Sequence, residues 1–111
     1  MRRRDYLGSL ELMVLLAVLR LGEDAYGVPI SREIEDQSGR PVPVASIYAA
    51  LLRLEEKDLV SCRLGNPTAE RGGRAKKYFE VTEQGVREAR QTQRALTRLW
   101  RGVRQLNGAT V

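Results

Sequence analysis

The apolar residues of this chain change their spacing at Asp58, and this change limits the folds that the chain can adopt. Before Asp58 they recur at the three- and four-residue intervals of amphipathic helices, whereas Leu59–Leu64 and Tyr78–Val81 alternate as strands do. The segment between the strands, Gly65–Lys77, is too polar and too rich in glycine to be a third strand. The pattern therefore predicts helices followed by a two-stranded hairpin.

Three helices are expected before the hairpin. The first has Ser9 as its N-cap and ends at Gly22, the second covers Tyr26–Gln37 with Pro29 in its first turn, and the third covers Val44–Lys57. Two prolines and a glycine mark residues 38–43 as a connector. Three helices and a hairpin, in that order, predict a mostly α-helical winged helix-turn-helix domain over residues 1–82.

After the hairpin, Thr82 is the expected N-cap of a long helix over residues 83–106, with residues 107–111 as a tail. Apolar residues follow this helix at alternating intervals of four and three, which is typical of a helix that packs on a partner helix. The first helix is apolar nearly all round, so a second subunit could cover its outer side. We therefore predict a homodimer. The expected interface residues are Leu12, Leu16, Ala89, Leu96, Leu99, Trp100 and Val103.

Charge and composition narrow the function. The 111 residues carry a net charge of +5, which suits an acidic partner such as nucleic acid. With no His and only Cys62, a zinc site of Cys and His ligands and an intrachain disulfide are both excluded, and no metal or cofactor is expected. No residue spacing suggests nucleophilic or acid–base catalysis, so the chain is not expected to be an enzyme.

No membrane association is expected. The longest apolar run, Leu12–Leu19, is far short of the roughly 20 residues that cross a bilayer. Asp5 and Glu11 place negative charges soon after the N-terminal arginines, and this argues against a secretory signal. We expect the protein in the cytoplasm.

The hairpin tip and the third helix are the candidate DNA contacts. The tip, Glu70–Lys77, has four cations and two glycines, which suit phosphates or a narrow minor groove; the alternative is a solvated, charged turn. On the third helix, Ser46, Ala49 and Arg53 are expected opposite the buried stripe, where they could contact bases or phosphates. Tyr48, at the margin, could bind a phosphate or pack in the core.

Two further residues have alternative interpretations. Trp100 is expected in the dimer seam, where it could serve only for packing or could also stack on a planar effector. Cys62 has no neighbouring His or second Cys, which favours a structural role over redox sensing. The arginines of the last helix could follow the DNA backbone, although a solvated outer face is favoured.

Across about residues 7–90 the sequence resembles the PadR family of bacterial transcriptional regulators. The segments that carry the resemblance are Leu10–Leu16, Ala25–Gly27, Ser46–Leu51 with Arg53–Glu55, Gly72–Tyr78 and Val81–Gly85. The resemblance implies a winged-helix repressor that dimerises through its first and last helices and places its third helix in the major groove. The chain is similar to the compact subfamily with a single C-terminal helix, and some members of that subfamily respond to small, flat, hydrophobic compounds that bind at the dimer interface.

By matching position, the resemblance implies that Ser46 and Tyr48 contact DNA from the third helix and that Gly73, Arg74 and Lys76 do so from the wing. The candidate DNA-binding residues are Tyr26, Ser46, Tyr48, Ala49, Arg53, Arg71, Gly73, Arg74, Lys76 and Lys77. Two positions depart from the family pattern: Asp58 replaces a glycine after the third helix, and Pro43 replaces a hydroxyl cap before it.

The sequence therefore predicts a DNA-binding regulator, a repressor that binds a pseudo-palindromic operator as a homodimer and that a small-molecule effector could release. The alternative is a winged-helix module that binds another protein and not DNA.

Overall fold

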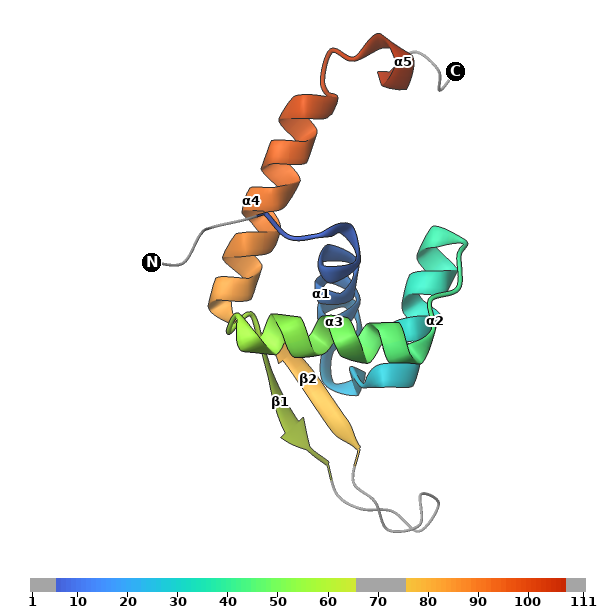
Figure 1. Ribbon diagram of the computed structural model, residues 1–111, viewed down its shortest axis with the longest axis vertical. Coiled ribbons are helices and arrows are strands. Elements are labelled where there is room, and N and C mark those ends of the chain that lie inside the picture. Colours follow the sequence, from blue (N-terminus) through green and yellow to red (C-terminus); the bar gives the residue numbers. More distant parts are fainter. Residues whose placement is uncertain (1–5, 66–75, 108–111) are drawn as a thin grey trace.

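The computed structural model describes residues 6–65 and 76–107. In chain order, the elements of Figure 1 are α1 (Ser9–Leu21), the 3-10 turn η1 (Gly22–Asp24), α2 (Gly27–Ser38), α3 (Val44–Glu56), β1 (Val60–Leu64), β2 (Lys77–Val81), α4 (Glu83–Trp100) and α5 (Arg104–Asn107). This is the order of a winged helix-turn-helix domain followed by a C-terminal helix, so the predicted fold class is confirmed.

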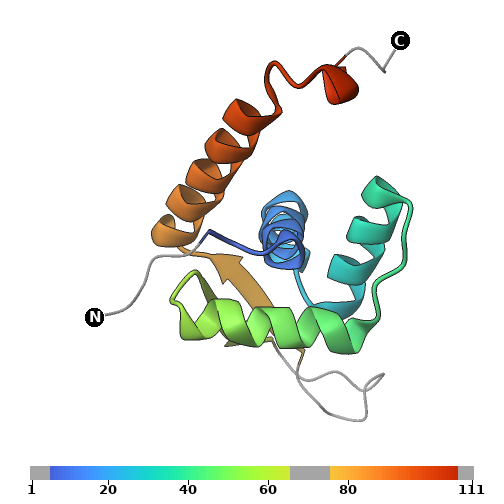
Figure 2. The same cartoon turned by 45° about the horizontal axis from the view of Figure 1, so that its top comes forward.

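The core lies where α1, α2, α3 and the hairpin meet. Figure 2 shows α1 between α2 and α4, with α3 crossing below it. The largest side chains that are fully buried are Val14, Leu15, Ile30, Ile47, Leu51 and Leu54. These residues recur at helical intervals on three helices, which is why the helices pack together.

The start of α1 differs from the expectation. Gly8 is the N-cap residue and Ser9 is the first residue of the helix, so the prediction of a Ser9 cap is wrong. The Glu11 side chain takes the capping role instead, because its Oε1 accepts a hydrogen bond from the Gly8 N–H at 3.1 Å. At the other end, Gly22 has a φ of 62° and stops the helix as expected.

The hairpin is antiparallel, with Val60 opposite Val81, Cys62 opposite Phe79 and Leu64 opposite Lys77. The Phe79 N–H donates to the Ala25 carbonyl oxygen at 2.8 Å, which ties β2 to the segment before α2. Asp58 enters the hairpin with a φ of 63°, the left-handed conformation expected where it replaces glycine.

The junction between the hairpin and α4 is held by Thr82. Its Oγ1 accepts from the Gly85 N–H at 3.0 Å and donates to the Asp58 carbonyl oxygen at 2.8 Å, which confirms Thr82 as the N-cap of α4. Gly85 lies so close to the chain before β1 that a Cβ there would collide with the Leu59 carbonyl oxygen. A glycine is therefore required at this crossing.

The last helix is shorter than expected and leaves the domain at an angle. α4 ends at Trp100, so the prediction of one helix to Leu106 is wrong. Gly102, with a φ of 82°, turns the chain out of the helical path before α5 begins. Because α4 projects from the packed helices, the molecule measures 55 × 40 × 20 Å (Figure 1).

Candidate nucleic-acid interface

The exposed face of α3 is small and almost uncharged. Opposite its buried stripe lie Ala45, Ala49, Leu52 and Glu56, all exposed. Leu52, which the sequence interpretation did not select, is 56% exposed. Ala49 lies on this face as expected. A surface of such short side chains allows a close approach to a partner, but it offers few hydrogen bonds to base edges.

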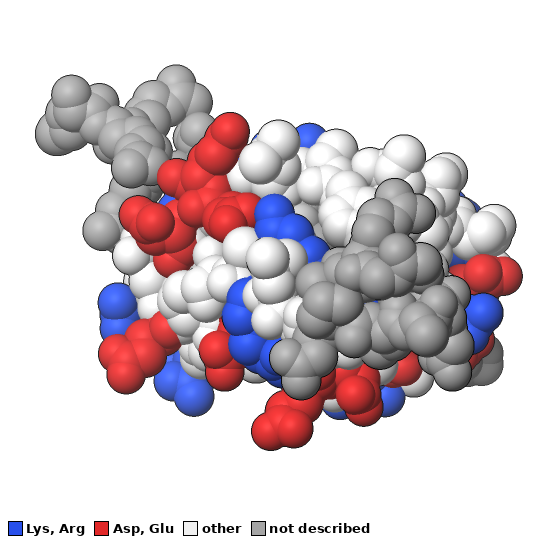
Figure 3. All heavy atoms as spheres, turned by 90° about the horizontal axis from the view of Figure 1, so that it is seen from below, with Lys and Arg blue, Asp and Glu red and all other residues white. Residues whose placement is uncertain are grey.

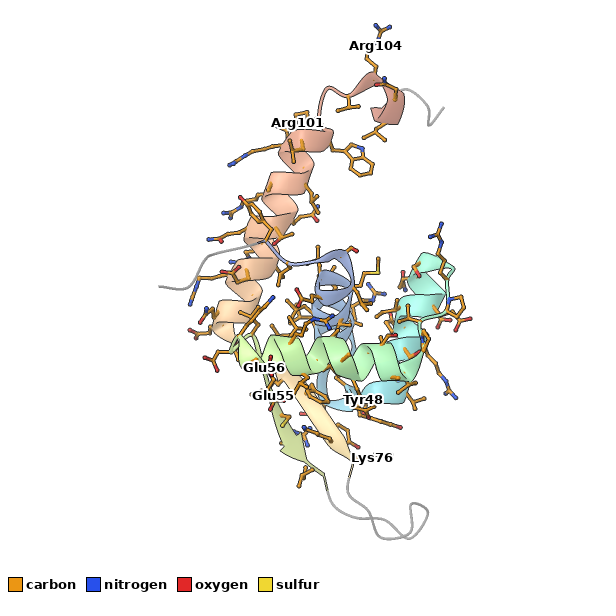
Figure 4. The ribbon with its side chains drawn as sticks, in the orientation of Figure 1. Tyr48, Glu55, Glu56, Lys76, Arg101 and Arg104 are labelled. Atoms are coloured by element: carbon orange, nitrogen blue, oxygen red, sulfur yellow. The ribbon has the colours of Figure 1, made fainter. Side chains whose placement is uncertain are left out.

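Tyr48 lies on the flank of α3 that faces the start of α2. Figure 4 shows its side chain below α3, on the side of the wing. Its ring packs so closely on Gly27 that a Cβ there would lie 2.5 Å from the Tyr48 Oη. Gly27 thus leaves room for the Tyr48 hydroxyl beside the first turn of α2. The N–H groups of a first turn point out of the helix and favour an anion, so the two elements together could hold a phosphate.

Ser46 and Arg53 lie on the other flank of α3. Arg53 follows Tyr48 by five residues, which places it about 140° away around the helix. Its Nε donates to Glu11 Oε2 at 3.2 Å, toward α1, and Ser46 is only half-exposed. Ala49 therefore lies opposite the core as expected, while Arg53 is 51% exposed but is bound by Glu11 on the flank, and a DNA contact by Ser46 or Arg53 stays a prediction.

Glu11 is the centre of a charged cluster between α1 and α3. Its side chain is 8% exposed, and Lys57 Nζ lies 3.2 Å from both carboxylate oxygens. Burial raises the pKa of this carboxyl, but hydrogen bonds from the Gly8 N–H, Lys57 and Arg53, with the charge of Lys57, outweigh burial and lower the pKa below its ordinary value. Glu11 is therefore ionised at neutral pH. The sequence interpretation missed this cluster.

The base of the wing is a stack of aromatic rings and cations. Tyr26 and Tyr78 meet edge to face at 5.4 Å between ring centroids. Lys76 Nζ lies 4.6 Å from the Tyr26 centroid and donates to its hydroxyl at 3.4 Å, while the Arg63 guanidinium lies 4.7 Å from the Tyr78 centroid. This stack fastens both strands to the residue that precedes α2. Arg63 and Tyr78 were missed, although they are cross-strand partners in the register.

Lys76 and Lys77 divide between the two faces of the hairpin. Lys76 is half-buried over Tyr26, and Figure 4 shows it at the end of β2 that leads to the tip. Lys77 is exposed, with its Nζ 4.0 Å from Glu55 Oε1. Arg71, Gly73 and Arg74, the other wing candidates, lie outside the described residues.

Charge is unevenly distributed over this face of the molecule. Figure 3, which views it from below, shows Lys and Arg side chains in the middle, uncharged surface to the upper right, and acidic side chains to the upper left and along the lower edge. Glu55 and Glu56 are at the end of α3 far from α2 (Figure 4). Because DNA is an anion, the acidic end of α3 favours contact through its N-terminal half and the wing.

Cys62 is exposed on β1, and its Sγ donates to Glu55 Oε2 at 3.2 Å. The hydrogen bond to Glu55 and burial raise the pKa of the thiol above its ordinary value. A protonated thiol is a poor nucleophile, so this shift disfavours redox sensing, and a structural role for Cys62 stays a prediction.

The expected dimer residues lie on two neighbouring surfaces. Leu12, Leu16 and Ala89 line an open groove of about 520 Å³ between α1 and α4. Ala89 also belongs to the core of its own subunit. Farther along α4 the apolar side chains are exposed: Leu99 is 74% exposed and Trp100 is 55% exposed, with Leu96 between these positions and the groove. Val103 lies beyond the end of the helix and is half-buried.

Trp100 borders a shallow hollow of about 420 Å³ with Gln93, Leu96, Thr97 and Arg101. The hollow belongs to one helix surface and is open to solvent, and Trp100 is exposed at its edge. Among residues 6–65 and 76–107, no helix has both the length and the apolar composition that crossing a bilayer requires.

Several solved structures have the same fold. A transcriptional regulator from Clostridium thermocellum matches with a TM-score of 0.73 at 18% identity over 88% of this chain and 89% of that one. A PadR family transcriptional regulator from Eggerthella lenta DSM 2243 matches with a TM-score of 0.69 at 28% identity over 85% of this chain and 80% of that one. A PadR-like transcriptional regulator from Bacillus cereus strain ATCC 14579 matches with a TM-score of 0.69 at 24% identity over 87% and 89%.

No curated protein matches the chain in sequence. The sequence model of the transcriptional regulator PadR-like family matches residues 15–91, a span that runs from α1 into α4 and covers more than half of the chain. This span includes α2, α3 and both strands of the hairpin. The members of the family are transcriptional regulators, in agreement with the expectation that the chain is not an enzyme. The protein therefore belongs to the PadR-like family of transcriptional regulators.

Proposed function

We propose that the protein is a repressor that binds a pseudo-palindromic DNA operator as a homodimer, through α3, the start of α2 and the wing. The observation that carries the proposal is the Tyr48 side chain, packed on Gly27 beside the first turn of α2 and next to the exposed face of α3. A phosphate at this turn would accept hydrogen bonds from backbone N–H groups and from the Tyr48 hydroxyl, and the positive end of the helix dipole would attract its charge.

The wing supplies charge next to this phosphate position. Lys77 is the first residue of β2 and Lys76 comes just before it, and Arg71 and Arg74 precede both in the sequence. The stack of Tyr26 and Tyr78 holds the base of the wing, where Lys76 lies, against the start of α2. Phosphate contacts of this kind set the position of the protein on DNA and make its affinity dependent on salt.

The short side chains of α3 suit a close fit in the major groove. Ala45 and Ala49 could meet thymine methyl groups, but they donate no hydrogen bonds. Much of the sequence preference would then come from the shape of the operator and from the spacing of its half-sites. A twofold dimer would place these half-sites one turn apart, about 34 to 36 Å.

Exposed apolar side chains support the dimer. Leu96 and Trp100 on α4 share a hollow with Gln93, which also lines the groove that Leu12 and Leu16 border on α1, and Leu99 is exposed on the same helix. A second copy could cover both surfaces through a twofold axis. The exposed indole of Trp100 is also a candidate surface for a flat, apolar effector that alters DNA affinity.

The direct test begins with selection of bound fragments from a random duplex pool, which returns half-site sequence and spacing together. Fluorescence anisotropy of the selected duplex is then followed across a salt titration. Arg74→Ala should weaken binding to every duplex and reduce the slope of log affinity against log salt by about one. Arg104→Ala is the matched control, since Figure 4 shows Arg104 at the end of the molecule opposite Lys76.

The outcome separates two classes of protein. A parent chain that binds no duplex even at low salt would contradict the proposal and favour the protein-interaction module. An unchanged salt slope in Arg74→Ala would remove the wing from the interface while leaving DNA binding in place.

A further inference from the structure

Two polar side chains, Glu11 and Thr92, are buried among the residues that the structure describes. Burial of a polar group costs free energy unless its hydrogen bonds are made, so such groups are placed where a specific connection is formed. Glu11 is in the first turn of α1, and Thr92 is in the middle of α4. Each accepts a hydrogen bond from one of the two residues that precede α1: Thr92 from the Leu7 N–H and Glu11 from the Gly8 N–H.

Glu11 fixes the C-terminal half of α3. Its carboxylate accepts from Arg53 Nε at 3.2 Å and from Lys57 Nζ at 3.2 Å, so it holds the last turn of α3 and the residue after it. Both cations are partly exposed, whereas Glu11 is buried, and the acid is therefore the fixed member of the cluster. The N-terminal end of α3 is held separately, because Ser31 Oγ donates to the Val42 carbonyl oxygen at 2.7 Å.

Thr92 extends this connection to α4. The Leu7 N–H donates to Thr92 Oγ1 at 3.5 Å, and the Leu7 side chain is buried in the core. The next residue, Gly8, donates its N–H to Glu11 Oε1. A short polar path therefore leads from α4 through the backbone of Leu7 and Gly8 to Glu11, and from Glu11 to α3.

We infer that Glu11 is a positioning residue for the DNA-reading helix, which sets the angle of α3 and ties it to α4 through Gly8, Leu7 and Thr92. The inference rests on the proposed DNA binding. Contacts to base edges require the helix at one depth and angle in the groove, whereas phosphate contacts tolerate small shifts. Loss of Glu11 should therefore reduce selectivity for the operator more than it reduces affinity for DNA in general.

The test compares Glu11→Gln with Glu33→Gln. Glu33 is the matched control, because it also joins two helices through an ion pair, with Arg20 Nε at 2.6 Å, but has no hydrogen bond or ion pair with α3 among the described residues. Anisotropy gives the affinity of each variant for the selected duplex and for a scrambled duplex of equal length. Glu11→Gln should lower the ratio of the two affinities about tenfold, with the scrambled affinity within about twofold of the parent. Glu33→Gln should leave the ratio unchanged.

Thr92→Val tests the part of the path in α4. It keeps the shape of the side chain but removes the hydroxyl that accepts from Leu7. Selectivity should fall in the same direction, and the double variant with Glu11→Gln should lose less than the two single losses combined. Parental selectivity in Thr92→Val would overturn the part of the inference that concerns α4.

Three other outcomes are decisive. A folded Glu11→Gln protein with parental selectivity overturns the inference, whereas a parent that binds no duplex overturns the proposed function instead. If circular dichroism shows that Glu11→Gln does not fold, the double variant Arg53→Gln, Lys57→Gln removes the same connection from its exposed side. An equal loss on both duplexes would then assign direct phosphate contacts to these cations and contradict a positioning role.

Discussion

Apolar side chains are buried in the core of the packed domain but exposed on the outer half of α4. The side chains of Leu51 and Leu54 on α3 are at most 1% exposed, whereas those of Leu99 and Trp100 on α4 are mostly exposed. The first pair belongs to the core cluster of its own chain. The second pair lies on the part of α4 that projects from the domain, where it is exposed. Leu51 and Leu54 are therefore covered within one subunit, whereas Leu99 and Trp100 leave an exposed apolar surface that a partner could cover.

This difference separates two sources of stability. Burial within a subunit is independent of protein concentration, whereas burial between subunits grows with concentration. The same residue type, leucine, occurs in both regions, so equivalent substitutions can compare them directly.

The largest effect is expected in the core. Leu54→Ala should lower the free energy of unfolding by about 2–5 kcal/mol, since it leaves a cavity in the core cluster. Leu99→Ala should change the unfolding of the monomer by no more than about 0.5 kcal/mol. Urea unfolding at a concentration where the chain is monomeric measures both. Similar losses for the two variants would contradict the division between the regions.

A second substitution examines what the projecting helix binds. Leu99→Asp should weaken self-association by about 2–3 kcal/mol, because a carboxylate would be buried at the proposed interface. Analytical ultracentrifugation of parent and variant gives the dissociation constants. Arg98→Asp, which alters charge at the adjacent position of α4, is the control. A parent that remains monomeric would show that the exposed apolar surface serves another partner.

A smaller effect is expected at Glu11, the charged exception within the packed domain. The pKa of its carboxyl is lowered in the folded protein, so the ionised group stabilises the fold above the pKa of the unfolded chain, and this contribution is lost as the pH falls through the folded pKa. Glu11→Gln should cost about 1–2 kcal/mol at pH 7 and progressively less below about pH 4. Unfolding in urea across this range provides the comparison; a difference that does not depend on pH would exclude ionisation as the cause.

Local signals predicted most of the fold. The change of period at Asp58 located the hairpin, because alternation along a strand is a property of neighbouring residues. Thr82 was identified as a cap because capping also depends on residues that are close together in the sequence. The end of α4 was not, since Val103 and Leu106 continue the apolar intervals beyond Gly102, and only the left-handed φ of that glycine shows the break.

The candidate interface was less predictable because its decisive contacts join distant parts of the chain. Arg53 was expected to face DNA, but its partner Glu11 is 42 residues away, and nothing in the spacing of α3 indicates that pairing. Tyr48 could be assigned to a margin of the helix, but not to the surface of Gly27. Helical periodicity tells which side chains are outside the core, whereas tertiary contacts decide what the outside ones bind.

The hydrogen bond between the Phe79 N–H and the Ala25 carbonyl oxygen has a consequence for folding kinetics. A two-stranded hairpin is only marginally stable alone, so this wing should form after the helices that support it. Its unfolding should also begin at that bond. In amide hydrogen exchange, the Phe79 proton would therefore report on the segment before α2 as well as on the strand, and substitutions near Ala25 should speed exchange in a strand that lies much later in the sequence.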